Sequence, residues 1–278
     1  MEHSGKLYIV ATPIGNLADI THRAVDILQQ VDVIAAEDTR HSQKLLQHYQ
    51  IDTRLISLHD HNESQRARQL IERMQKGLDV ALISDAGTPL ISDPGYALVN
   101  QCRAENLEVI PIPGACAAIT AMCAAGLATD RFRFEGFLPV KEQARQQALD
   151  LLQEESATCV FYESPRRIVD TIRWVGKVLG DERQLVLAKE LTKTFETFRT
   201  GTASQIEAWL TEDAVHQKGE FVLLISGYQR DTGNIPAAAI NLLKSLMQEL
   251  PLKKAAALVA SHYELKKNDL YKLGLEIS

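Results

Sequence analysis

Short apolar segments alternate with helical segments throughout the first 116 residues of the chain. Each apolar segment is rich in β-branched residues and ends in turn or polar residues; the segments are 6–13, 32–39, 54–58, 79–85 and 108–114. This alternation predicts a mostly parallel sheet with helices on both faces. Ligands of such sheets bind at the carboxyl ends of the strands. The loops that contain Pro and Gly follow those ends here, so we expect the functional site there.

The pattern changes after a small-residue helix that begins near residue 117. Only two clear helices, 164–180 and 204–211, accompany five further strands, which we expect at 132–139, 158–164, 184–190, 194–202 and 220–227. Five strands with only two helices between them predict an α+β domain with a mixed or antiparallel sheet. A cluster of turn residues then precedes three helices, the last two resembling a helix-turn-helix, although such a tail is about as often a packing or dimerisation module as a nucleic-acid binder. We therefore expect an α/β domain, an α+β domain and a small helical domain, at 1–116, 117–230 and 235–278.

The composition predicts a protein without a membrane span, because the longest apolar runs fall short of the roughly 20 residues that a span needs. The N-terminus has no basic segment followed by a long apolar stretch, so we expect no secretory signal and a cytoplasmic protein. The net charge of −6 argues against non-specific coating of nucleic acid. It hides an asymmetry, because residues 241–278 hold six Lys against four acids, a net +2, which leaves −8 for the rest.

Three Gly- and Pro-containing loops follow predicted strands: TPIGN (12–16), SDAGTPLISDPG (84–95) and PIPGACAA (111–118). None matches a dinucleotide or nucleoside triphosphate motif, and no Lys or Arg occurs between residues 77 and 102. A single Gly-Pro turn is most often only a turn. Three together favour a ligand that needs close backbone approach and carboxylates but has no phosphate, and S-adenosylmethionine fits this description. Within the long loop we expect Asp85 and the backbone of Gly87 and Thr88 to hold ligand, and Asp93 to Gly95 to cap the next helix.

Six motifs in their order and spacing closely resemble the tetrapyrrole-methylase-like (class III) methyltransferases, over essentially the whole chain. They are LYIVATPIGNLADIT, AAEDTRHS, ISDAGTPLISDPG, PIPGACAAITAMCAAGL, FEGFLP and FYESPRRI. Tetrapyrrole-modifying members usually carry a G-G-D-P turn, whereas this chain has Ala86-Gly87-Thr88-Pro89, which favours the branch that acts on small-subunit ribosomal RNA. The resemblance implies a two-domain fold with S-adenosylmethionine in the cleft between the domains, and a homodimer. The reaction implied is methylation of a cytidine ribose 2′-hydroxyl in the decoding region of 16S RNA.

Carried over residue by residue, the resemblance implies a cofactor site built from four loops. Its residues are Pro13, Ile14, Gly15, Asp85, Ala86, Gly87, Thr88, Pro89, Leu90, Ile91, Ser92, Pro113, Gly114, Ala115, Ala117, Tyr162 and Glu163. Methyl transfer mainly requires alignment, to which a positioned base can add about 10²–10⁴-fold. The candidate catalytic residues are Glu37, Asp38, Arg40, Glu163 and Lys189. A charged residue just after a strand is more often a cap or a surface ion pair, so these candidates are not ranked.

RNA binding requires cations, and several basic residues follow strand ends that should face the cleft. The RNA-binding candidates are Arg40, Lys44, Arg166, Arg167 and Lys189, with Lys253, Lys254, Lys266 and Lys267 in the helical tail. The stretch His59-Asp60-His61 resembles a metal site but lacks further ligands, and the four Cys residues show no zinc spacing, so we expect no metal. Two other functions stay open: a methyltransferase of the same fold acting on a tetrapyrrole or other small molecule, and a non-catalytic ribosome-binding assembly factor.

Overall fold

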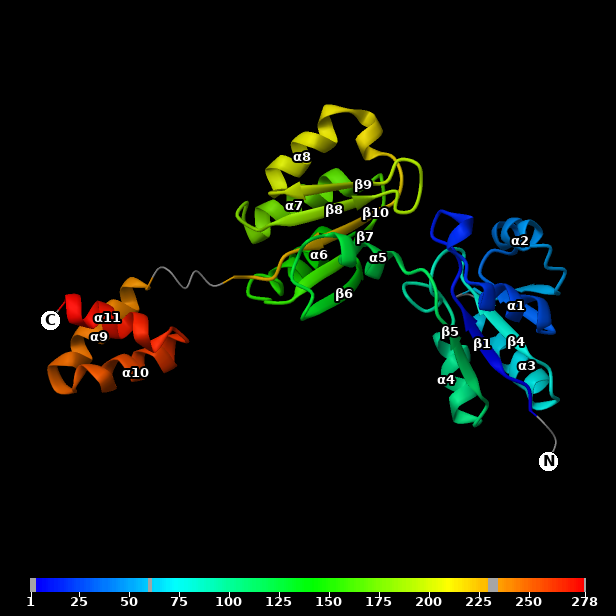
Figure 1. The fold of residues 1–278 in the computed structure, drawn as a ribbon, viewed down its shortest axis with the longest axis horizontal. Coiled ribbons are helices and arrows are strands. Elements are labelled where there is room, and N and C mark those ends of the chain that lie inside the picture. The colour runs from blue at the N-terminus through cyan, green and yellow to red at the C-terminus, as the bar shows by residue number, and fades with distance from the viewer. Residues whose placement is uncertain (1–3, 60–61, 230–234, 278) are drawn as a thin grey trace. The chain divides into compact units, whose positions relative to one another are not determined.

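The computed structural model describes residues 4–59, 62–229 and 235–277. The chain divides into two compact units, Met1–Tyr228 and Gln229–Ser278, and each is described by itself (Figure 1). The first unit contains both predicted sheets, and the second contains the predicted helical tail. Among the described residues, no helix has both the length and the apolarity to cross a bilayer.

The first sheet is parallel throughout, as the alternating pattern predicts. Its strand order is β3-β2-β4-β1-β5, and the strands are β1 (Leu7–Val10), β2 (Val33–Ala36), β3 (Leu55–Ser57), β4 (Val80–Ile83) and β5 (Val109–Ile112). One face packs on α1 (His22–Gln30) and α2 (Thr39–His48). The other face packs on α3 (Glu63–Gln75) and α4 (Tyr96–Ala104). The central strands are buried on both sides, which explains their uninterrupted apolar sequences.

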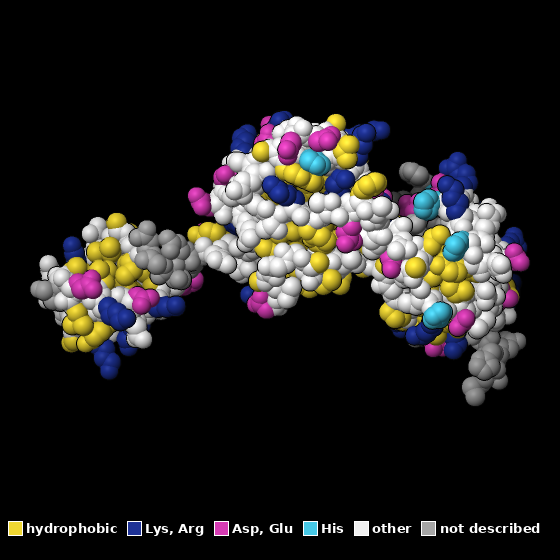
Figure 2. All heavy atoms as spheres, turned by 45° about the horizontal axis from the view of Figure 1, so that its top comes forward, with side chains coloured by type: hydrophobic (Ala, Val, Ile, Leu, Met, Phe, Trp, Pro, Cys, Tyr) yellow, Lys and Arg dark blue, Asp and Glu magenta, His cyan; other side chains and the backbone are white. Residues whose placement is uncertain are grey.

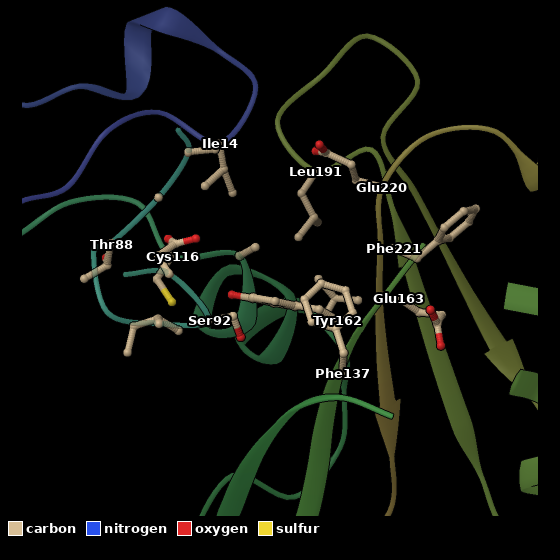
Figure 3. Close-up of a pocket in the computed structure, with 16 residues that line it drawn as sticks. Ile14, Thr88, Ser92, Cys116, Phe137, Tyr162, Glu163, Leu191, Glu220 and Phe221 are labelled. Atoms are coloured by element: carbon tan, nitrogen blue, oxygen red, sulfur yellow. The ribbon is translucent and has the colours of Figure 1, made fainter. Parts of the chain in front are cut away.

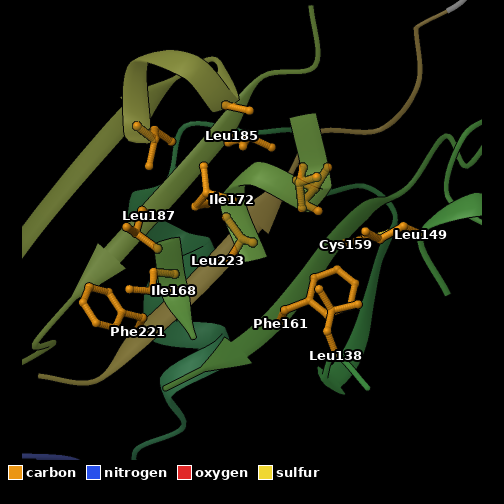
Figure 4. Close-up of a cluster of buried hydrophobic side chains, with 14 of the residues drawn as sticks. Leu138, Leu149, Cys159, Phe161, Ile168, Ile172, Leu185, Leu187, Phe221 and Leu223 are labelled. Atoms are coloured by element: carbon orange, nitrogen blue, oxygen red, sulfur yellow. The ribbon is translucent and has the colours of Figure 1, made fainter. Parts of the chain in front are cut away.

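The second sheet is mixed, with strand order β6-β7-β10-β8-β9. Only β6 and β7 run parallel to each other; the strands are β6 (Phe132–Phe137), β7 (Thr158–Glu163), β8 (Leu185–Lys189), β9 (Thr197–Gly201) and β10 (Phe221–Ile225). Figure 4 shows the core on one face, where Phe161, Leu187 and Leu223 meet Ile168 and Ile172 from α7 (Ile168–Leu179). The opposite face packs on α5 (Ala117–Ala124), whose small residues allow close contact with β7 and β10.

The same core face of this sheet is also covered by α8 (Ala203–Glu212) and by α6 (Glu142–Asp150). The sequence pattern misses α6, because only Leu149 and Arg145 of this polar segment are buried. Arg145 is buried by pairing with Asp170 and by donating to the backbone oxygens of Pro139 and Val140. A helix held by a buried Arg gives no apolar stripe in the sequence. Two short 3₁₀ helices, Leu17–Asp19 and Ala214–Gln217, complete the unit.

The C-terminal unit contains the three expected helices, α9 (Ala237–Glu249), α10 (Leu252–Tyr263) and α11 (Lys267–Glu276). Pro251 is the residue before α10, and α11 begins in the KKND segment, as the sequence predicts. Their core is built largely from Ala and Leu. Gly274 packs closely on Leu252: a Cβ at this position would lie 2.1 Å from Leu252 Cδ1, so a larger residue would require the Leu252 side chain to move.

The long loop after β4 ends where α4 begins, and its geometry corrects one expectation. Gly95 precedes α4 with φ of +129°, and no side chain of this loop caps the helix. Instead Glu63 Oε1, at the start of α3, accepts hydrogen bonds from the backbone N–H groups of Gly95, Ala97 and Leu98 at 3.1, 2.7 and 3.3 Å. The expectation that Asp93 to Gly95 cap the helix is therefore wrong for Asp93, whose side chain is left for another role.

Replacing Glu63 with Ala should destabilise the first unit by about 1–2 kcal/mol, because three backbone donors at the start of α4 lose their acceptor. Urea unfolding of Glu63→Ala measures this loss. Glu72→Ala, in the exposed part of the same helix, is the matched control and should change stability by less than about 0.5 kcal/mol. Equal losses in the two variants would show that Glu63 does not act as the cap.

Candidate active site

A cavity of about 230 Å³ lies where the carboxyl ends of the parallel strands face the second sheet. It is lined by the loops after β1, β4 and β5, by β6 and β7, by the loop after β8 and by the start of β10 (Figure 3). Its lining residues are Ile14, Ala86, Gly87, Thr88, Ile91, Ser92, Asp93, Cys116, Ala117, Phe137, Tyr162, Glu163, Leu191, Glu220, Phe221 and Val222. Residues from both sheets therefore form one site.

Backbone hydrogen bonds hold two of the loops together on one side of the cavity. Thr12 N donates to Gly87 O at 2.8 Å, and Gly87 N donates to Thr12 O at 3.1 Å. Thr88 Oγ1 donates to Ala115 O at 3.0 Å, which adds the third loop. Gly87 has φ of +84°, and a Cβ there would lie 3.3 Å from Ile14 Cγ2. This position therefore needs Gly both for its backbone conformation and for the space beside the cavity.

Tyr162 of β7 connects the opposite side of the cavity to α5. Its hydroxyl accepts a hydrogen bond from Ala118 N at 3.2 Å, and its ring makes edge contacts with Phe134 and Phe137. Figure 3 shows the Tyr162 hydroxyl directed toward Cys116. Burial raises the pKa of this hydroxyl, and the neighbouring Cys116 raises it further. Tyr162 is therefore a neutral wall of the cavity at physiological pH.

The loop after β8 closes the edge of the cavity near Glu220. Lys193 Nζ bridges Glu190 Oε1 at 2.8 Å and Glu220 Oε2 at 2.9 Å. Burial alone would lower the pKa of Lys193, but the two carboxylates raise it overall. The Lys193 side chain also covers Gly15, where a Cβ would come within 2.7 Å of Lys193 Cγ. The loop after β1 is thereby packed directly against the second sheet.

The cavity is acidic. Among the described residues that line it, none is Lys, Arg or His, and three are acids. Glu220 is paired with Lys193. Glu163 is only 3 % exposed; its Oε2 accepts from Thr171 Oγ1 at 2.6 Å, its Oε1 accepts from Ser164 N at 2.7 Å, and Arg167 lies 3.4 Å away. These contacts draw the Glu163 carboxylate toward α7, and Figure 3 shows it directed away from Cys116 and Ser92.

Asp93 is the third acid, and no cation is paired with it in the described part of the chain. Burial raises its pKa to about 6, and the charge of Asp85 adds to this while a hydrogen bond with Ser84 opposes it. Sequence reasoning missed this residue, because Asp-Pro-Gly before a helix is typical of a cap. A partly buried carboxyl with a perturbed pKa in a cavity is a common property of functional sites.

Many of the cofactor residues expected from the sequence do lie around the cavity. Those that line it are Ile14, Ala86, Gly87, Thr88, Ile91, Ser92, Ala117, Tyr162 and Glu163. The others lie behind the lining: Ala115 O binds Thr88, Gly114 packs on Ala11, and Asp85 Oδ1 accepts from Asp38 N at 3.0 Å. Pro13, Gly15 and Pro113 belong to the same loops but do not line the cavity. Whether these residues bind a cofactor stays a prediction.

The other candidate catalytic residues lie outside the cavity lining. Asp38 is the N-cap of α2, and hydrogen bonds from the Arg40 side chain and backbone hold its pKa at about 2. Arg40 itself is largely exposed, and Glu37 is half-buried beside it. Lys189 was expected to face the cleft, but it is only 6 % exposed. In the sheet register it lies opposite Phe221, on the face that packs on α7 and α8. Lys189 therefore does not face the cleft and is not an exposed cation.

The RNA-binding candidates divide by exposure. Arg167 is partly buried and donates to Leu138 O at 2.6 Å, so it holds the start of α7 rather than offering a free charge. Exposed cations remain at Arg40, Lys44, Arg166, Lys253, Lys254, Lys266 and Lys267. Figure 2 shows Lys and Arg side chains on the surface of the C-terminal unit, next to exposed hydrophobic side chains.

The described residues contain no cluster of His, Cys, Asp and Glu arranged to hold a metal ion. Of the His59-Asp60-His61 stretch, Asp60 and His61 lie outside the described residues, and His59 is bonded to Asn62. Cys102 and Cys159 are buried, whereas Cys116 is half-buried at the cavity and Cys123 is exposed.

Comparison with known proteins decides the family. Residues 6–207 match the family described as Tetrapyrrole (Corrin/Porphyrin) Methylases, and residues 233–278 match the RsmI C-terminal HTH domain. A ribosomal RNA small subunit methyltransferase I from Vibrio cholerae is 56% identical over 97% of this chain and 94% of its own length. One from Pasteurella multocida is 57% identical over 98% of both chains. The chain belongs to the ribosomal RNA small subunit methyltransferase I family.

Solved structures agree on the fold of the first unit. A diphthine synthase structure covers 80% of this chain and 90% of its own, with a TM-score of 0.63 and 13% identity. Methyltransferases of this family and fold use S-adenosylmethionine. The cavity fits this cofactor, because its lining is mostly apolar and backbone on the side of Ile14, Gly87 and Leu191, and because it offers acids but no cation to a sulfonium.

Adding a side chain at Gly87 should weaken cofactor binding. In Gly87→Ala the new methyl group lies against Ile14 at the cavity and the residue keeps a positive φ, so we expect roughly a tenfold rise in the Kd for S-adenosylmethionine, measured by calorimetry. Gly126→Ala is the matched control, because Gly126 has φ of +70° but a Cβ there meets nothing within 4 Å. A change of the same size in both variants would contradict the role assigned to the Gly87 position.

Asp93→Asn should stabilise the protein at pH 8. The folded-state pKa of about 6 lies above the unfolded value of 3.8, so ionised Asp93 costs stability as pH rises from about 4 to 6 and the cost persists above that range. The full pKa shift corresponds to roughly 3 kcal/mol. We expect the free energy of unfolding to rise by only about 1 kcal/mol in the variant, because solvent reaches part of the Asp93 side chain and screens the effect. Urea unfolding at pH 4 and pH 8 measures it, and an equal difference at both pH values would contradict the assignment.

Proposed function

We propose that this chain methylates the ribose 2′-hydroxyl of a cytidine in the decoding region of small-subunit ribosomal RNA, using S-adenosylmethionine. The relatives at 56–57% identity are named for ribosomal RNA of the small subunit, and they match this chain over nearly its whole length. The observation that carries the proposal is the acidic cavity at the carboxyl ends of the parallel strands, which has backbone on one side and a half-exposed aromatic ring, Phe137, on the other. A homodimer in the cytoplasm is part of this proposal.

When bound, the cofactor supplies an activated methyl group on a positively charged sulfur. The chain's own contribution is to orient the two reactants and to exclude water, which in well-oriented systems supplies about 7–11 kcal/mol of the barrier. Ile14 and Leu191 give the cavity apolar walls, and the loops around Gly87 and Ala115 offer backbone groups held by their mutual hydrogen bonds. The acidic lining matches a cationic sulfur and leaves phosphate binding to residues outside the cavity.

We assign binding of the RNA backbone to cations near the cavity and to cations in the helical tail. Arg166 is exposed three residues after Glu163, which lines the cavity. The tail adds exposed Lys residues at the starts of α10 and α11. Phosphate contacts by Lys and Arg give RNA affinity that falls with salt. The partly buried Arg167, which is held by Leu138 O and Glu163, and the buried Lys189 are not part of this surface.

Methyl transfer can be followed with tritium-labelled cofactor offered to naked 16S RNA, to assembled small subunits and to a mixture of porphyrin precursors. We expect label in RNA that survives alkaline hydrolysis as a resistant dinucleotide, because a methylated 2′-oxygen cannot attack the neighbouring phosphate. Label only in the porphyrins would replace the RNA substrate with a tetrapyrrole. No cofactor binding at millimolar concentration would support the assembly-factor alternative.

A charge reversal separates the RNA substrate from a small molecule. Arg166→Glu should weaken RNA binding about tenfold or more and make the remaining affinity depend less steeply on salt, because a phosphate contact is lost, while cofactor affinity stays unchanged. Glu212→Gln, at the exposed last residue of α8, is the control for a surface charge change elsewhere in the same unit. RNA affinity that is unaffected by Arg166→Glu would remove this residue from the RNA-binding surface.

A further inference from the structure

We propose that Asp93 accepts the proton of the ribose hydroxyl that is methylated, from a nucleotide whose base lies against Phe137. This inference rests on the proposed function, because it assigns the nucleotide end of the same cavity. It concerns a residue that the sequence pattern assigned to a helix cap, and it replaces the five candidates that the sequence left unranked.

The acids near the cavity differ in what they are bonded to. Glu163 is held by Thr171, Ser164 and Arg167, and Glu220 is paired with Lys193. The oxygens of both carboxylates are thus already engaged by hydrogen-bond donors or by a cation. Asp38 is paired with Arg40 outside the cavity. Among the described lining residues, Asp93 is the carboxylate without a paired cation.

Asp93 and the exposed aromatic ring of Phe137 lie on neighbouring segments of the cavity lining. A Cβ on Gly136 would lie 3.6 Å from Ser92 Oγ, so the irregular segment of β6 touches the loop that carries Asp93. Phe137 and Asp93 are the next residues on either side of this contact, and both line the cavity. Phe137 is 53 % exposed although it is a large hydrophobic residue. An exposed ring at a cavity mouth offers a stacking surface for an unpaired base.

Charged groups and backbone groups lie at different ends of the cavity. The end formed by Ile14, Gly87 and Leu191 offers apolar and backbone surface and suits the cofactor, whereas Asp93 and Phe137 offer one acid and one ring. The surroundings of Asp93 also disfavour its ionised form, because burial and the charge of Asp85 raise its pKa. The titratable groups close to it are Asp85 on its own loop, Tyr162 and Glu163 of β7, Cys116 before α5 and Glu220 before β10, and none is a cation. Such surroundings make the ionised carboxylate a better proton acceptor.

The chemical step balances with one acceptor. The hydroxyl O–H bond breaks and its proton goes to a carboxylate oxygen of Asp93. The ribose oxygen forms a bond to the methyl carbon, and the electron pair of the methyl–sulfur bond stays on sulfur. The neutral carboxylic acid then loses its proton to solvent, which is possible because Asp93 is only partly buried.

The decisive experiment compares the wild-type protein with Asp93→Asn in single-turnover methylation of the RNA substrate between pH 5 and pH 9. A positioned base contributes about 10²–10⁴-fold, so the variant should lose at least 10²-fold in rate at pH 8. The wild-type rate should fall tenfold per pH unit below about pH 6, where Asp93 takes up a proton, and the variant should show no such fall. Calorimetry should give the same Kd for S-adenosylmethionine in both proteins.

Two further variants test the geometry. Phe137→Ala should raise KM for RNA fivefold or more with a small effect on kcat, because it removes the stacking surface and leaves the acceptor. Glu220→Gln, a change of charge in the same cavity, should retain the acidic limb of the wild-type pH profile.

Each outcome bears on the inference. An Asp93→Asn protein that methylates RNA at the wild-type rate, or that keeps the acidic limb, overturns it. A loss of cofactor affinity that matches the loss of rate overturns it as well, because Asp93 would then hold the cofactor. Absence of methyl transfer to RNA by the wild-type protein is a different result, since it removes the proposed function and not only the role of Asp93.

Discussion

The pair of backbone hydrogen bonds between Thr12 and Gly87 is the contact on which the site depends. It joins the loops that leave β1 and β4, two neighbouring strands at the centre of the parallel sheet. Adjacent parallel strands end at the same edge, but the loops beyond them diverge unless something connects them. The connection is made by main chain, and it leaves the side chains of both loops available to line the cavity. The hydrogen bond from Thr88 to Ala115 extends it to the loop after β5.

Much of the fold could be predicted from the sequence, because its strands are short uninterrupted apolar runs. The predicted strands contain all ten strands found in the described residues, with ends that differ by at most three residues. The α6 helix could not be found in the same way, since its buried partner is Arg145 and not an apolar stripe. Local sequence patterns indicate which apolar residues are buried. They do not indicate a charged side chain that is buried by pairing with groups distant in the sequence.

The site was predictable to the level of loops but not of individual side chains. Gly87 and the motif around it indicated the correct edge of the sheet. Asp93 and Lys189 were misassigned for related reasons, because each role depends on a partner far away in the sequence. Glu63 takes over the cap of α4 and frees Asp93, and the register of β8 against β10 turns Lys189 into the helix-covered side of the sheet. Neither fact can be read from the residues that flank these two positions.

The bridge of Lys193 to Glu190 and Glu220 has a consequence for the shape of the cavity wall. All three residues belong to the second-sheet side, and the Lys193 side chain that the two carboxylates hold in place packs on Gly15 of the loop after β1. The ion pairs therefore fix the side chain on which that loop rests. Glu220 is mostly exposed, so rising ionic strength weakens its attraction to Lys193. High salt would thereby loosen the packing between this loop and the second sheet without changing any residue that lines the cavity.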